Sequence, residues 1–181
     1  MKRTIFTILT AGMVSAAALS GPALASDNKD QAEIALFQSA QTDVAAAIRA
    51  AETATGGTAI SAEFDEKNGA GRWEVKTVTG TARTEVKIDA TTGQVIETKD
   101  KGDLSGKRNP VTPDMLGGSL LDMVTRAETQ GAGKVMSIEA EHENGQFVGL
   151  DVEIVKADGT VQDFLLNPAD GTMTPVVDND D

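Results

Sequence analysis

The second half of this sequence repeats the first half. Ala51–Thr53 returns as Ala127–Thr129, and Asn68-Gly69 returns as Asn144-Gly145 at the same spacing along the chain. The hydrophobic positions between and beyond these markers also correspond: Ile60 with Met136, Ala62 with Ile138, Val86 with Phe164, and Ile88 with Leu166. A repeat of this length is a small domain rather than a solenoid unit. The sequence therefore predicts two tandem domains.

Hydrophobic periodicity predicts the elements of the first copy. Apolar residues recur with the period of a helix over residues 31–55, which indicates one helix, or two with a break at Thr42-Asp43, ended by Gly56-Gly57. Alternation of apolar and polar residues then predicts antiparallel strands, with a hairpin turn at residues 67–69. A short closing strand is predicted over residues 94–97.

The second copy shows the same order of signals. Thr112-Pro113-Asp114 predicts a helix that starts with proline at its first position. The strands that follow are predicted over residues 135–141, 146–156, 161–166 and 173–177. The expected fold class is therefore α+β, with two tandem repeats that each pack a helix on a three- to four-stranded antiparallel sheet. The predicted divisions are a signal peptide (1–25), a polar leader (26–30), domain 1 (31–100), a linker (101–111), domain 2 (112–177) and an acidic tail (178–181).

The N-terminus predicts export. A basic start, Lys2-Arg3, precedes an apolar stretch and a small-x-small site at Ala23–Ala25, which is typical of a secretory signal peptide. The apolar stretch is too short and too interrupted to predict a membrane anchor. We expect a periplasmic or secreted protein with no membrane span after cleavage.

Charge and composition limit the function classes. The chain has a net charge of −12, which becomes −14 once Lys2 and Arg3 leave with the signal peptide. This charge argues against binding of nucleic acid or anionic membranes. With 3% aromatic residues and no cysteine, the small cores are expected to support each other or a partner, which leaves homo-oligomerisation open.

The sequence predicts no catalytic site, no cofactor and no metal site. There is no cysteine, and the only histidine, His142, lies in a polar run that predicts a solvated side chain. Asp89, Asp158, Asp170 and the tail aspartates offer oxygen ligands but lack the spacing of a calcium loop. We therefore predict that the protein is not an enzyme.

The first copy resembles the PepSY domain. The strand at residues 72–78 and the closing segment at residues 86–95, with its Asp-Ala-x-x-Gly turn, follow the typical family pattern. The second copy departs from it, since Val152 replaces the aromatic residue and residues 167–171 carry a different turn. The resemblance covers residues 40–99 strongly and 115–177 weakly. It implies a non-catalytic module, with peptidase inhibition or regulation as the usual proposal.

Two hypotheses for function follow. The first is a protein- or peptide-interaction module of the cell envelope, which regulates or inhibits a peptidase through an open sheet face or an edge strand. The alternative is an envelope protein that binds a small ligand or a cation such as calcium. For the first hypothesis, the alternation predicts an outward interaction face on the first copy: Ser61, Glu63, Asp65, Glu74, Lys76, Arg83, Glu85 and Lys87.

Overall fold

The computed structural model describes residues 28–176 of the chain. The predicted signal peptide, the start of the polar leader and the predicted acidic tail lie outside the described residues. Within residues 28–176, no helix is long and apolar enough to cross a membrane.

The predicted N-terminal helical region consists of two helices, α1 (Asn28–Ser39) and α2 (Val44–Thr55). The break lies where Thr42-Asp43 suggested, because the Asp43 side chain accepts a hydrogen bond from Ala46 N and starts α2 as its N-cap. Gly56 ends α2 in the left-handed conformation, with φ of 65°. The predicted leader was wrong at residues 28–30, which belong to α1.

Four strands follow, and each pairs with the next in antiparallel fashion. They are β1 (Thr58–Lys67), β2 (Ala70–Thr79), β3 (Ala82–Asp89) and β4 (Val95–Asp103). The predicted closing strand over residues 94–97 was too short, because β4 continues along β3 into the stretch expected to be a linker. A 3-10 turn, η1 (Leu104–Gly106), comes directly after β4.

The second half also places one helix before four strands. A 3-10 turn, η2 (Pro113–Leu116), precedes α3 (Leu120–Gly131), and the strands are β5 (Lys134–Glu143), β6 (Gln146–Val155), β7 (Val161–Leu166) and β8 (Met173–Pro175). The predicted helix start at Thr112–Asp114 was wrong, because the proline starts η2 instead. Helix α3 begins after Ser119, whose side chain accepts from Asp122 N in a capping box.

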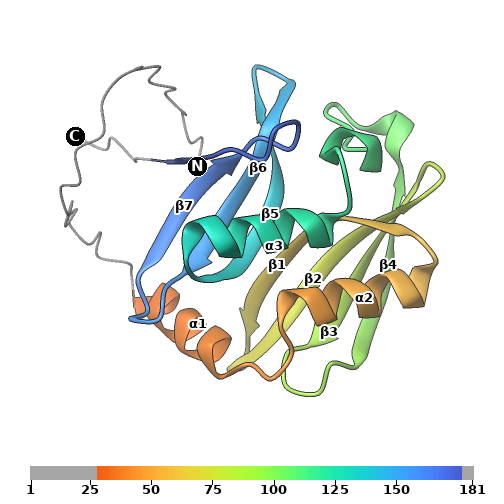
Figure 1. Ribbon diagram of the computed structural model, residues 1–181. Coiled ribbons are helices and arrows are strands. Elements are labelled where there is room, and N and C mark those ends of the chain that lie inside the picture. Colours follow the sequence, from red (N-terminus) through yellow and green to blue (C-terminus); the bar gives the residue numbers. More distant parts are fainter. Residues whose placement is uncertain (1–27, 177–181) are drawn as a thin grey trace, which may run out of the picture.

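All eight strands form one antiparallel sheet in the order β4-β3-β2-β1-β5-β6-β7-β8 (Figure 1). The separate sheets expected for the two halves are therefore joined, and β1 and β5 are central strands. Ala62 pairs with Ile138 at the joint, and Glu63 pairs with Ser137. Ala62 and Ile138 are corresponding positions of the sequence repeat. The chain is a mixed α+β structure with three α-helices over residues 28–176.

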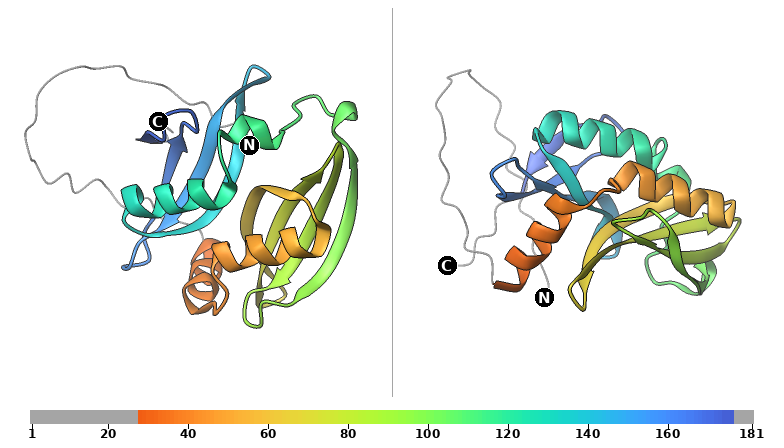
Figure 2. Two further views of the ribbon diagram at one scale, coloured as in Figure 1. Left: turned by 45° about the vertical axis from the view of Figure 1, so that its right-hand side comes forward. Right: turned by 90° about the horizontal axis from the view of Figure 1, so that it is seen from below.

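The three helices lie against one face of this sheet (Figure 2). Their apolar sides and the inward residues of the strands form a continuous core that includes Ile48, Trp73, Val124, Ile138 and Ile154. The opposite face of the sheet carries the polar residues of the alternation, and we call it the open face.

Aromatic residues anchor α1 to the sheet. Phe37 of α1, Phe64 of β1 and Trp73 of β2 meet edge to face, with centroid distances of 5.3 to 6.0 Å. Trp73 is fully buried, and its Nε1 donates a hydrogen bond of 2.8 Å to the backbone oxygen of Thr42. The same loop residue donates its backbone N–H to Ala90 O, so the connection between α1 and α2 is fastened to the sheet at two points.

Candidate functional site

The sheet brings the eight predicted interaction residues to the open face. Their strand neighbours Ala62, Val75 and Val86 are fully buried under the helices, so alternation turns the eight residues the other way. Two of the eight were wrongly expected to be solvated, because Ser61 is 5% exposed and Glu85 is 6% exposed. The role of this face in an interaction stays a prediction.

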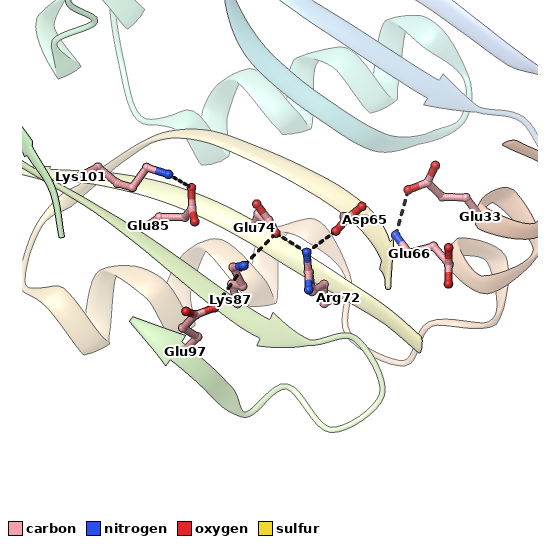
Figure 3. A network of polar contacts seen from close by, with 9 residues as sticks. All are labelled: Glu33, Asp65, Glu66, Arg72, Glu74, Glu85, Lys87, Glu97 and Lys101. Atoms are coloured by element: carbon pink, nitrogen blue, oxygen red, sulfur yellow. Dashed lines mark hydrogen bonds and ion pairs between the residues drawn. The ribbon is translucent and has the colours of Figure 1, made fainter. Parts of the chain in front are cut away.

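On β1 to β4, opposite charges face each other across the strands (Figure 3). Arg72 contacts both Asp65 (2.5 Å) and Glu74 (2.7 Å). Lys87 contacts Glu74 at 3.4 Å and Glu97 at 3.1 Å. Such cross-strand pairs each stabilise a sheet by a few tenths of a kcal/mol to about 1 kcal/mol. This half of the open face is therefore electrostatically balanced.

Glu85 shows the effect of this pairing on a buried carboxylate. Burial raises the pKa of Glu85, but a hydrogen bond of 2.8 Å from Lys101 and the charges of Lys101 and Lys87 outweigh burial and leave that pKa below its ordinary value. Sequence reasoning missed Lys101, because it assigned that residue to a linker rather than to β4.

On the other side of the joint, carboxylates oppose carboxylates. Glu139 of β5 is paired with Asp151 of β6, and Glu153 of β6 is paired with Asp163 of β7. At the joint itself, Glu63 is paired with Glu74 of β2. Like charges directly opposite each other destabilise a sheet. We call the open-face carboxylates of β1, β5, β6 and β7 the acidic half: Glu63, Asp65, Glu139, Glu141, Asp151, Glu153 and Asp163.

One lysine reaches into the acidic half. Lys76 of β2 donates a hydrogen bond of 2.6 Å to Glu139 Oε1 of β5. Strand β1 lies between these two strands, and the residue of β1 opposite Lys76 is Ser61. The small serine side chain leaves room for the lysine to cross β1. Burial lowers the pKa of Lys76, but the ion pair with Glu139 outweighs burial and raises that pKa overall.

Glu63 is the most perturbed titratable group of the open face. Burial and the neighbouring charge of Glu139 raise the pKa of Glu63 to about 7, against the opposing effect of Lys76; Glu74 and Asp65 add smaller increases. At neutral pH this carboxyl exchanges its proton, whereas an ordinary glutamate is ionised.

The Glu139→Gln substitution tests this assignment. It removes a neighbouring negative charge and frees Lys76 to approach Glu63. We expect the pKa of Glu63 to fall to about 6, since loss of one like-charge neighbour is worth about one pKa unit. A carbon-detected NMR titration of the side-chain carboxyls measures it. The matched variant Glu97→Gln, on the distant strand β4, should leave the pKa of Glu63 unchanged. A wild-type pKa no higher than that of an ordinary glutamate would contradict the assignment.

The aspartates considered for calcium serve turns. Asp89 accepts hydrogen bonds from Thr91 N (3.0 Å) and Thr92 N (2.7 Å), and these bonds lower its pKa. Asp158 and Asp170 each accept from the backbone and hydroxyl of the threonine two positions later. Over residues 28–176, no group of three or more acidic, histidine or cysteine side chains could hold a metal ion.

His142 is not fully solvated as predicted. It is half-buried on β5, and its ring meets Phe147 of β6 edge to face at 5.8 Å between centroids. The contact explains the burial without a catalytic or metal-binding role.

The sequence contained a signal for the carboxylates that the prediction missed. The repeat aligns Glu63 with Glu139, and acidic residues alternate with apolar residues on β5 and β6 as they do on β1. The prediction considered only the first copy. The register of the joint, which brings Glu139 beside Glu63 and Lys76, could not be read from either copy alone.

Comparison with known proteins gives one family match. Residues 43–99 match the family model described as "Peptidase propeptide and YPEB domain" (PepSY). No curated protein matches the chain. Among solved structures, a "putative lipoprotein" from Clostridium difficile 630 is similar at 15% identity and a TM-score of 0.43, covering 72% of this chain and 89% of that one. At that TM-score, the likeness does not establish a shared fold. The chain therefore carries a PepSY match from α2 to β4, inside a mixed α+β structure.

Proposed function

We propose that this protein is a non-catalytic interaction module of the cell envelope, which binds a partner polypeptide on the open face of its sheet. The observation that carries the proposal is the arrangement of that face. The three helices lie on the other side, and the open face collects charged residues from strands β1 to β7. A broad charged surface without a helical cover is suited to binding another protein.

The edges of the sheet are less suited to binding by strand addition. Edge strand β8 is short and ends in Pro175, which has no N–H to donate. Edge strand β4 has register shifts near both ends and carries Lys99 and Lys101. Short strands, proline, irregular pairing and lysine all discourage edge-to-edge addition. We therefore favour the open face over the edges as the binding surface.

We also propose that residues 112–177 are a second PepSY-like domain. The same order of one helix and four strands supports this, as does the pairing of Ala62 with Ile138, which are equivalent in the repeat. Equivalent residues of two copies pair with each other where a local two-fold axis relates the copies. The acidic half would then extend across the joint between the copies.

The proposed partner is an envelope peptidase that the protein restrains. The description of the matched family, a peptidase propeptide domain, supports this class of partner, and the predicted signal peptide supports the location. The alternative, a calcium-binding protein, has less support because the turn aspartates accept hydrogen bonds within their own turns.

The test is affinity capture from an envelope extract with the chain from Ser26 onward as bait, followed by mass spectrometry. Two variants serve as further baits: Glu141→Lys on the open face and Thr125→Lys on the exposed side of α3. We expect a peptidase that is retained by the wild type and Thr125→Lys but lost with Glu141→Lys, and that is inhibited by the purified chain. Capture of nothing by the folded wild type would contradict the proposal. Equal capture by all three baits would exclude the open face.

A further inference from the structure

The two halves of the open face differ in how their charges are arranged. On β2 to β4, Glu74 faces Lys87, and Lys76 faces Glu85. In the acidic half, the directly opposed pairs are Glu139 with Asp151 and Glu153 with Asp163. The same sheet thus uses complementary pairing on strands β2 to β4 and like-charge pairing on strands β5 to β7. A fold that keeps destabilising pairs on one surface commonly does so for function.

The side chains around the joint provide a second observation. Ser61 Oγ is buried on the open face and has no hydrogen-bond partner. The Lys76–Glu139 ion pair crosses β1 at this serine. Buried hydroxyl groups are nearly always hydrogen-bonded, so an unpartnered one calls for an explanation. Three oxygen-bearing side chains, those of Ser61, Glu63 and Glu139, therefore surround a position that Lys76 only partly neutralises.

We propose that the acidic half binds a basic, extended polypeptide segment, with one lysine or arginine side chain of that segment seated between Glu63 and Glu139. This inference rests on the proposed function and specifies the chemistry of the partner. The seated ammonium or guanidinium group donates to both carboxylates and to the Ser61 hydroxyl oxygen. Further basic side chains of the segment pair with Asp151, Glu153 and Asp163. Charge-assisted hydrogen bonds of this kind are the strongest that side chains form.

Binding depends on pH around neutrality. The groups that face Glu63 are Glu139 of β5, Lys76 and Glu74 of β2, and Asp65 of β1. A bound cation favours the ionised form of Glu63, so binding releases a proton when the free carboxyl is protonated. Affinity is therefore higher at pH 8 than at pH 6.

The probe is a short fluorescein-labelled peptide of alternating lysine and threonine, measured by fluorescence anisotropy in low salt with the chain from Ser26 onward. The same peptide with glutamate in place of lysine is the negative control. We expect the double variant Glu63→Gln/Glu139→Gln to weaken binding at least about tenfold, which corresponds to about 1.4 kcal/mol. The matched double variant Glu97→Gln/Asp100→Asn removes the same charge from exposed positions of β4 and should weaken it less than about twofold.

Three results would overturn the inference. Equal weakening by both double variants would show attraction by net charge alone. Absence of binding by folded wild type would show that the acidic half is not a peptide site. Tight binding of Ca²⁺ alone, lost in Glu63→Gln/Glu139→Gln, would assign these carboxylates to a metal. A peptidase that the wild type and Glu63→Gln/Glu139→Gln capture equally would leave the proposed function standing while this inference fails.

Discussion

Replacing Trp73 with alanine should lower the free energy of unfolding by about 3 to 5 kcal/mol. The side chain is fully buried and contacts Phe37 and Phe64 edge to face. Its removal leaves a large cavity and also removes the hydrogen bond to the backbone oxygen of Thr42. Because that bond and the Phe37 contact hold α1 and its loop, we expect α1 to detach before the sheet unfolds.

Urea unfolding followed by far-UV circular dichroism measures this effect, since Trp73 is the only tryptophan and its fluorescence is lost in the variant. Trp73→Phe keeps most of the packing but not the hydrogen bond, and should cost about 1 to 2 kcal/mol. Ile96→Ala removes a side chain that is 57% exposed and should change stability by less than about 0.5 kcal/mol. A loss below about 1 kcal/mol for Trp73→Ala would contradict the role given to the aromatic cluster.

Replacing Glu63 with glutamine should stabilise the protein at pH 8 by about 1 to 2 kcal/mol. The pKa of Glu63 is about 7 in the folded state, against 4.5 for the ordinary group. The folded state therefore holds the proton more tightly, so wild-type stability falls as pH rises from about 4.5 and the penalty is complete above about 7. Each pKa unit corresponds to about 1.4 kcal/mol, and solvent screening of a part-exposed carboxyl reduces the total.

The stabilisation should shrink to less than about 0.5 kcal/mol at pH 5, where the folded-state carboxyl is already protonated in the wild type. Thermal unfolding at both pH values measures it, with an expected rise in Tm of about 3 to 6 °C at pH 8. Glu97→Gln, at a side chain that is 51% exposed, serves as the control and should show no such pH dependence. If Glu63→Gln were instead destabilising at pH 8, attraction to Lys76 would outweigh repulsion from Glu139, Glu74 and Asp65.

Strands that depend on local pattern were predicted closely. The strand β7, over residues 161–166, has the predicted bounds, and the bounds of β6 are nearly those predicted. The break between α1 and α2 also followed from local chemistry, because an aspartate at position 43 can cap a helix. These features need only neighbouring residues, so a single sequence contains them.

Features that depend on distant partners were missed. Strand β4 extends to Asp103 because β3 offers it a partner along its whole length, while its own residues look like a linker. Ser61 and Glu85 alternate like surface residues, yet both are buried: Lys76 crosses β1 at the serine, and Lys101 pairs with the glutamate. In each of these positions the environment is set by a side chain or strand that is not a neighbour in the sequence.

The sequence by itself determined the repeat, the helix-then-strands order of each half, and the face to which each strand residue points. These follow from the periodicities of helices and strands and from turn chemistry, all of which act over short distances. The tertiary structure decided that β1 and β5 join the halves into one sheet. That pairing places Glu139 beside Glu63 and raises the pKa of Glu63. Charge interactions depend on separation in space, and the sequence does not contain the separation between two residues that lie in different copies of the repeat.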